Sequence, residues 1–315
     1  MKLTPRRKKI FLAAALVLVA VILTGCAIPR DADNKIIYIW TEQVSGYTVR
    51  TSFADVMKNE NWFSAIFVYP LSAIINRLAP VLSVGGAIAL VTIVVNAILA
   101  AATLKSSIAQ QQMQLVQPEL ERIQRKYEGR EDQASKMRQA QEMQALYQKY
   151  QINPGSMILV TFLQFPVIIA MYMAVQRSFA VATGTFLGMD LQATPMSGIQ
   201  AVLKGDMSGL SLFLLWVLMG LCQFMSMRIP MILQKRAAEK EAAKHHRRPE
   251  VSKNSQNMIM QVYMMGMILV FGLMWPAAMS LYWAINSLVN IVKTLIVQNI
   301  IDKRKEEQQA RGARR

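Results

Sequence analysis

Five long apolar runs dominate the hydrophobicity pattern of this 315-residue chain. Each run holds about 20 residues, which matches the hydrocarbon core of a bilayer and exceeds what a water-soluble core needs. The last two runs form one stretch that is too long for one crossing, and Trp275-Pro276 supplies an interfacial aromatic residue and a helix breaker within it. The pattern predicts an all-α polytopic membrane protein with spans over residues 82–104, 155–178, 208–228, 256–275 and 277–300.

The first 25 residues combine a basic start with a short apolar segment, which is the layout of a secretory signal. The segment ends in Leu23-Thr24-Gly25-Cys26. This ending resembles the bacterial lipoprotein signal, whose cysteine is acylated, as by palmitate, and becomes the first residue of the mature protein. We therefore expect a signal peptide over 1–25 and a lipid-anchored Cys26 at the outer leaflet. An uncleaved anchor with a chance cysteine is the alternative.

Two segments outside the spans are also expected to be helical. Within 26–81, apolar residues recur among polar ones at helical spacing, which predicts an extracytoplasmic segment with an amphipathic helix lying in the membrane interface. In 105–154, Gly129 separates two strongly helical stretches, which predicts a cytoplasmic helical hairpin. The mixed charges of the hairpin suit either a solvated surface or a docking arm for lipid head groups, a targeting factor or the ribosome.

The formal net charge of +16 is distributed unevenly along a chain that is 53% hydrophobic. Residues 27–81 carry five basic and five acidic groups, whereas 229–255 carry seven basic and three acidic groups, and 301–315 carry six and three. Because cytoplasmic loops of membrane proteins are enriched in Lys and Arg, we predict a basic cytoplasmic loop over 229–255 and a basic cytoplasmic tail over 301–315. The N-terminus then lies outside the cell membrane, as five crossings require.

Five sequence blocks, in this order along the chain, carry a resemblance to a known family. They are Phe67-Val68-Tyr69-Pro70-Leu71-Ser72, Gln117-Pro118-Glu119-Leu120, Ala145-Leu146-Tyr147, Phe162-Leu163-Gln164-Phe165-Pro166 and Pro276-Ala277-Ala278-Met279-Ser280-Leu281-Tyr282-Trp283. Over about residues 62–303 the chain resembles the YidC/Oxa/Alb family of membrane protein insertases. The lipoprotein leader makes it similar to the insertases of Gram-positive bacteria.

The resemblance implies a five-helix bundle around a hydrophilic groove that accepts the polar part of a nascent membrane protein. The implied partners are nascent membrane proteins and the lipid bilayer, with the Sec translocon, the signal recognition machinery and the ribosome as further candidates. No cofactor and no enzymatic reaction are implied. The residues agree, because the chain has no phosphate-binding loop of the Walker type and no carboxylate pair within the spans.

One position departs from the family pattern in the first span. The family usually has Thr, three residues and then Arg, whereas this chain has Thr92 and then Asn96. Thr92, Asn96 and Thr103 share one side of the predicted helix, so a polar stripe remains. This stripe predicts either a retained wet groove or small polar residues that join helices.

The last span offers a candidate replacement for the missing arginine. Tyr282, Asn286, Asn290 and Lys293 share one side of that helix, and family members tend to have Gln in place of Lys293. Asn96 and Lys293 each lie nine residues before a charged residue at the end of the span, or about 13 Å. We therefore expect both at one depth, where Lys293 supplies the charge of the groove; the alternative is a lysine that snorkels to the interface.

Two further residues in the family blocks, Gln164 and Trp283, complete the predicted client groove. Other polar residues in the spans, Gln223 among them, are more simply interhelical hydrogen-bonding groups.

The leading functional prediction is a membrane protein insertase and chaperone that acts alone or with the Sec translocon. A specialised paralogue that assembles or stabilises particular membrane partners is the alternative, because Asn96 replaces the family arginine. A transporter would need paired ionisable residues deep in several spans, and an enzyme would need a nucleophile, a base or a metal cluster. Direct sequence-specific nucleic-acid binding is not expected, since the basic loop and tail suit lipid or ribosomal phosphates equally.

Overall fold

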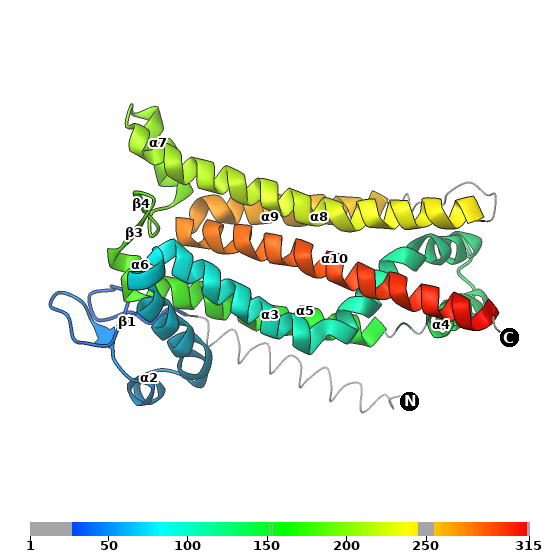
Figure 1. The fold of residues 1–315 in the computed structure, drawn as a ribbon, viewed down its shortest axis with the longest axis horizontal. Helices are drawn as coiled ribbons and strands as arrows, with labels where there is room; N and C mark the ends of the chain where they lie inside the picture. Colours follow the sequence, from blue (N-terminus) through cyan, green and yellow to red (C-terminus); the bar gives the residue numbers. More distant parts are fainter. Residues whose placement is uncertain (1–26, 151, 153, 245–254, 314–315) are drawn as a thin grey trace. The chain divides into compact units, whose positions relative to one another are not determined.

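The computed structural model describes residues 27–150, 152, 154–244 and 255–313, and these residues are mostly helical (Figure 1). The helical elements are α2 (Phe53–Asn59), η1 (Ser64–Val68), α3 (Tyr69–Lys126), α4 (Gln133–Lys149), α5 (Pro154–Arg177), α6 (Phe179–Thr183), α7 (Pro195–Leu203), η2 (Met207–Gly209), α8 (Leu210–Lys244), α9 (Ser255–Met274) and α10 (Ala277–Ala313). Short strands form two-stranded sheets: β1 (Tyr38–Ile39) pairs in parallel with β2 (Val49–Arg50), and β3 (Thr185–Phe186) pairs antiparallel with β4 (Met189–Asp190). The predicted all-α class is confirmed.

Three helices within the described ranges are long and apolar enough to cross a membrane: Ser64–Lys126, Met207–Ala237 and Ala277–Arg304. The second and fourth predicted spans correspond to α5 and α9, which are continuous helices of 24 and 20 residues. The number of crossings stays a prediction. The chain forms two compact units. Unit 1 holds the described residues of Met1–Thr92, Gln164–Leu215 and Met274–Tyr282. Unit 2 holds the described residues of Ile93–Leu163, Trp216–Leu273 and Trp283–Arg315.

The long helix α3 is interrupted at Ser83, where φ is 65° and ψ is 165°. A positive φ is rare for a residue with a side chain, so the chain changes direction at this point. Before the break lie the exposed apolar side chains of Phe67 and Ile74, within the segment predicted to be an amphipathic interfacial helix. Immediately after it, a side chain on Gly85 would lie only 2.3 Å from the ring of Phe186, so glycine is required there.

The segment between the first two predicted spans is a helical hairpin within unit 2. The end of α3 packs against α4, and Gly129, with a φ of 76°, lies in the turn between them. The buried members of their shared core are Val116, Leu120, Leu146 and Ile152. At the rim, Lys126 Nζ and the Tyr127 hydroxyl both donate to Glu142 Oε1, at 2.5 Å and 2.8 Å. Apolar contacts thus join the two arms, and an ion pair closes their outer edge.

Helices extend into the two segments that were predicted as a basic loop and a basic tail. The helix α8 continues to Lys244, well into the segment 229–255, and α10 continues to Ala313, nearly through 301–315. Both segments are rich in Ala, Glu, Lys, Gln and Arg, which are strong helix formers. The excess of positive charge is a signal of membrane sidedness and does not end a helix.

A buried ion pair fastens the first described segment of unit 1 to the end of α5. Arg177 is fully buried, and its two terminal nitrogens donate to the two oxygens of Glu60 at 2.6 Å and 2.7 Å. Arg177 Nε also donates to the carbonyl oxygen of Ile37 at 2.9 Å. Around this pair, Ile39, Phe63 and Met173 belong to one apolar cluster. The guanidinium therefore connects α5, the residue before β1 and the residue that follows α2.

Replacing Glu60 by glutamine should destabilise the protein strongly. The substitution leaves Arg177 buried without a countercharge, and breaking a buried pair in this way costs about 3–5 kcal/mol. The melting temperature of the purified full-length protein measures the effect. Glu42→Gln is the matched control, because Glu42 is exposed and forms no ion pair within the described residues. Equal melting temperatures for the two variants would contradict the structural role of the pair.

The hairpin should loosen in acid. The hydrogen bond from Lys126, followed by that from Tyr127, lowers the pKa of Glu142 below its ordinary value of 4.5. A carboxylate with a lowered pKa stabilises the folded state above the unfolded pKa and loses this contribution as the pH falls through the folded value. Hydrogen exchange of residues 113–150, corrected for the chemical rate, should therefore show more frequent opening as the pH falls below the ordinary pKa of 4.5.

The Glu142→Gln variant tests the assignment of this effect. It should open more readily than the native protein at neutral pH and show a weaker pH dependence. The control Glu128→Gln, which changes an exposed residue next to the turn, should keep the native profile. The same pH dependence in Glu142→Gln as in the native protein would show that another group causes the loosening.

Candidate functional site

Three predicted groove residues lie along α3, with Thr92 in unit 1 and Asn96 and Thr103 in unit 2, and all three are buried. The Thr92 hydroxyl donates to the carbonyl oxygen of Ile88 at 2.7 Å. The Thr103 hydroxyl donates to that of Leu99 at 2.6 Å. A threonine can stay inside an apolar helix in this way because the turn before it accepts the hydroxyl proton. The stripe is polar, and its two hydroxyls are already bonded within the helix.

Asn286 on α10 carries a buried acceptor without a donor. Asn286 is 8% exposed, and its Oδ1 accepts no hydrogen bond from any residue that the structure describes. Buried amide oxygens in proteins are nearly always paired, and leaving one unpaired costs on the order of 1–3 kcal/mol. The atom is therefore a preformed acceptor inside an apolar part of unit 2.

The neighbouring residue on α10 joins this region to α8. The hydroxyl of Ser287 donates to Gln223 Oε1 at 2.7 Å. The interhelical role predicted for Gln223 is thus confirmed. Nearby in sequence, the indole nitrogen of Trp216 donates to the carbonyl oxygen of Leu269 at 3.0 Å, which joins α8 to α9. Neutral amides, hydroxyls and an indole, rather than ion pairs, hold these helices together.

A second pair of amides indicates the level of Asn96, that is, which turn of α10 corresponds to it along the helices. Within unit 2, Gln111 Nε2 donates to Gln298 Oε1 at 2.6 Å, and Ile108 shares a buried cluster with Val297 and Ile301. The two helices run in the same direction (Figure 1). Asn96 lies 15 residues before Gln111 on α3, and Trp283 lies 15 residues before Gln298 on α10. Counted along the two helices from this hydrogen bond, the turn of α10 that corresponds to Asn96 therefore begins at Trp283 and contains Asn286.

The equal depth of Lys293 and Asn96 stays a prediction. Along α10, Lys293 lies five residues before Gln298, whereas along α3, Asn96 lies 15 residues before Gln111. The prediction took Lys105 and Asp302 as equivalent ends of two spans. Both residues lie within helices that continue past them, so neither marks the end of a helix.

The stretches of α3, α8 and α10 that precede their first basic residues within the spans carry no charged side chain. In α3 no charged residue occurs between Arg77 and Lys105, in α8 none occurs before Arg228, and in α10 none occurs before Lys293. Neutral amides and hydroxyls exchange hydrogen bonds with donors and acceptors alike. This composition favours contact with polar groups of either charge over selective binding of an anion.

The remaining predicted residues differ in their surroundings. Asn290 and Lys293 are half-buried, while Trp283 is buried in unit 2. Tyr282 is fully buried and Gln164 half-buried in unit 1. The predicted lipidation site, Cys26, lies outside the described residues. Their roles as groove or anchor residues stay predictions.

Sequence reasoning missed two polar pairs that the structure brings together. Gln111 and Gln298 are 187 positions apart, and Glu60 and Arg177 are 117 positions apart. Helical periodicity detects neighbours on one helix but not partners on two helices. The available signal was weaker: Arg177 directly follows an apolar run, where a cation has to find a partner or reach water.

The comparisons with known proteins agree with the family resemblance. The family model described as 60Kd inner membrane protein matches residues 75–305, which include every predicted span. Membrane protein insertase YidC 2 of Bacillus anthracis is 27% identical over 296 residues, covering 93% of this chain and 94% of the relative. Membrane protein insertase MisCA of Bacillus subtilis is 28% identical, with coverages of 79% and 84%. Membrane protein insertase YidC 2 of Listeria innocua is 26% identical, with coverages of 98% and 88%.

Thiol crosslinking tests the level assigned to Asn96. In a Cys222→Ala background, the pair Gln111→Cys and Gln298→Cys should react efficiently with a short, rigid bifunctional reagent, because the two side chains are in contact. The pair Asn96→Cys and Lys293→Cys should react poorly, because the two positions lie on the order of 10 Å apart along the helices. Crosslinking yields in membranes measure both pairs. Efficient reaction of the second pair would support the prediction that Asn96 and Lys293 share one depth.

Proposed function

Because the chain belongs to the 60Kd inner membrane protein family, the insertases of the YidC/Oxa/Alb type, we propose that it inserts and folds nascent membrane proteins in the bacterial cell membrane through a hydrophilic groove. The family acts on nascent membrane proteins, and the apolar helices make this chain a membrane protein.

The observation that carries the proposal is the buried, unpaired acceptor of Asn286 in a neutral stretch of unit 2. A client segment that enters a bilayer has to replace the hydrogen bonds that water made with its polar groups, because unsatisfied polar groups in hydrocarbon are costly. Asn286 Oδ1 accepts a client N–H without first giving up a bond to a described residue. Asn96, at about the same level, supplies a second amide.

The driving force in this proposal is the burial of the client's own apolar segment. Moving apolar surface out of water releases about 25 cal/mol per Å², which for a segment of span length exceeds the cost of a few polar groups held by neutral amides. The polar residues lower the barrier for the translocated part, and the bilayer takes up the apolar part. Such a reaction forms no covalent bond and hydrolyses no nucleotide.

The orientation follows from the charge distribution. We place the N-terminus outside as a lipid-anchored Cys26 and the C-terminus in the cytoplasm, with 105–154, 229–255 and 301–315 on the cytoplasmic side. The hairpin of α3 and α4 and the two basic segments then face the compartment in which clients are made. They are the proposed contact points for the Sec translocon, the signal recognition machinery and the ribosome.

A specialised paralogue is the second candidate function, and one observation favours it. Asn96 stands where the family usually has an arginine. A groove without a fixed cation lacks the attraction that favours acidic client tails. As a specialised paralogue, the protein assembles or stabilises particular membrane partners with neutral or basic tails.

Complementation of an insertase-depleted bacterium should separate the two functions. The native chain supports growth if it is a general insertase and fails if it is a specialised paralogue. In the second case Asn96→Arg should restore growth by returning the positive charge. Failure of both variants, with normal amounts of protein in the membrane, would contradict the general insertase function.

Asn286→Leu tests the residue that carries the proposal. Loss of one neutral hydrogen bond is worth about 0.5–1.5 kcal/mol, so insertion of a single-span client into proteoliposomes should slow by about two- to tenfold. The thermal stability should stay the same or rise, because a buried unpaired oxygen is removed. Asn299→Leu changes an exposed asparagine on the same helix and is the matched control. Equal insertion rates for the two variants would exclude Asn286 from client contact.

A further inference from the structure

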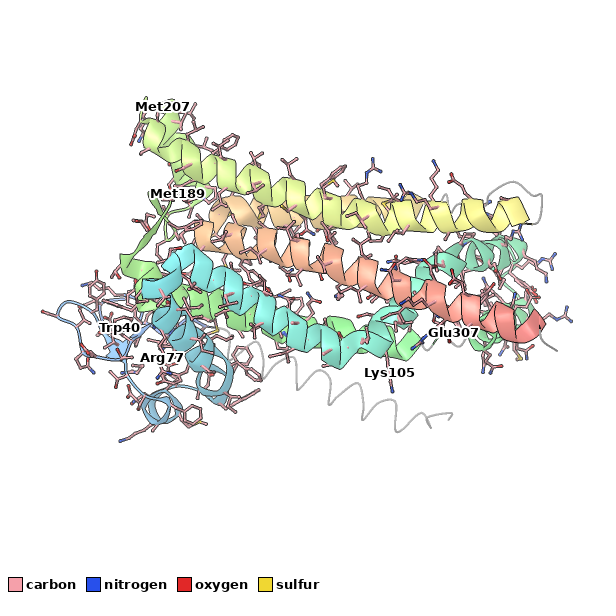
Figure 2. The ribbon with its side chains drawn as sticks, viewed as in Figure 1. Trp40, Arg77, Lys105, Met189, Met207 and Glu307 are labelled. Carbon is pink, nitrogen blue, oxygen red and sulfur yellow. The ribbon has the colours of Figure 1, made fainter. Side chains whose placement is uncertain are left out.

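A small cavity lies in unit 1, on the wall that the first described segment forms with the beginning of α3. Its volume is about 120 Å³. Trp40 and Thr41 after β1, Thr51 after β2, and Tyr69 and Arg77 of α3 contribute side chains of hydrogen-bonding type to its lining. Figure 2 labels Trp40 and Arg77 on this part of the chain. The groove proposed for clients uses none of these residues.

The walls of the cavity are held in place by buried hydrogen bonds. Asn76 Nδ2 donates to the carbonyl oxygen of Ile39 at 2.6 Å, which fixes the end of β1 against α3. Asn76 Oδ1 accepts from the Ser178 hydroxyl at 2.6 Å and from the Ala180 amide at 3.0 Å. On the other side, the Tyr69 hydroxyl donates to the carbonyl oxygen of Thr51 at 3.2 Å. The cavity is therefore formed before any ligand enters.

The electrostatic character of the cavity is positive. No carboxylate is among its lining residues, and Arg77 is exposed and forms no ion pair within the described part of the chain. In the adjoining segment, Glu60 already gives both oxygens to Arg177, and Glu42, next to the lining residue Thr41, is exposed. Arg50 reaches Glu60 only at 3.8 Å, and its buried Nε has no hydrogen-bond partner among the described residues. Among the lining residues, the guanidinium of Arg77 is thus the one formal charge at neutral pH.

Arg77 also lies within an apolar, exposed face of α3. Ile74, three residues before it, is 45% exposed, and Val81, four residues after it, is 80% exposed. Residues at these spacings are neighbours on a helix surface. An arginine between exposed apolar side chains, beside Trp40 and Tyr69, is the arrangement that proteins place at a membrane interface. The same face therefore offers contacts for an acyl chain and for an anionic headgroup.

We propose that this cavity binds the phosphodiester headgroup of an anionic phospholipid. The guanidinium of Arg77 holds the phosphate through charge-assisted hydrogen bonds, for which its planar fork is suited. Thr41, Thr51 and Trp40 supply hydroxyl and indole groups for the rest of the headgroup, and the acyl chains lie along Ile74 and Val81. The bound lipid would stabilise the first described segment of unit 1 against α3, independently of any client.

Lipid retention by the full-length protein tests this site. The protein is purified in mild detergent and titrated with phosphatidylglycerol or phosphatidylcholine, and bound lipid is measured by native mass spectrometry. We expect the native protein to prefer phosphatidylglycerol. Arg77→Gln should weaken this binding by about tenfold, as the loss of a hydrogen bond to a charged group predicts, while binding of phosphatidylcholine stays the same. Arg77→Lys should keep part of the preference.

Controls separate the site from general attraction of anionic lipid. Lys58→Gln removes an exposed cation from α2 that does not line the cavity, and it should leave the preference unchanged. If Arg77→Gln unfolds, Thr51→Val replaces it and should weaken binding of phosphatidylglycerol. Undiminished phosphatidylglycerol binding in a folded Arg77→Gln protein would overturn the proposal. So would full displacement of the lipid by millimolar glycerol phosphate or inorganic phosphate, because the site would then bind a soluble anion.

Discussion

Every polar group that a helix carries into hydrocarbon has to find its partner inside the protein, and this constraint determines much of the structure. Thr92 and Thr103 satisfy their hydroxyls on their own helix, Ser287 bonds to Gln223, and Gln111 bonds to Gln298. These groups are all uncharged, so each is accommodated at the cost of one hydrogen bond rather than of a desolvated ion. Against this background, the unpaired oxygen of Asn286 is an exception among the described residues, as are the hydroxyls of Ser107 in α3 and Ser280 in α10.

Outside the uncharged stretches of the predicted spans, ion pairs attach segments to one another. In unit 1, Arg177 and Glu60 are buried together and hold the first described segment. In unit 2, the exposed pair of Lys126 and Glu142 closes the hairpin and stays open to water. A buried pair resists local opening because either ion alone is costly to bury, whereas an exposed pair contributes little and responds to pH. The two attachments thus differ in how easily they open.

The breaks between helices could be predicted from the sequence better than the contacts between distant segments. Gly129 and Pro276 act locally, because a left-handed turn and a missing backbone N–H interrupt a helix whatever surrounds it. The partners of Arg177 and Gln298 depend on the three-dimensional packing of distant segments, which no periodicity contains. The lengths of the helices were not predicted for a related reason: charged residues were taken as the ends of spans, but α3 and α10 continue as helices past them. The stripe of Asn96, Asn286 and their neighbours was visible in the sequence, but the unpaired oxygen was not.

The central claim is that a client's polar segment passes the neutral level of Asn96 and Asn286. Site-specific photocrosslinking to a stalled nascent client tests it most directly, with the photoreactive residue placed at position 286 or, as the comparison, at the exposed Leu288 on the same helix. The account predicts that position 286 crosslinks to the polar residues that flank the client's span and that position 288 crosslinks mainly to lipid or to the apolar span. Adducts with the polar flank from position 288 but not from 286 would contradict it.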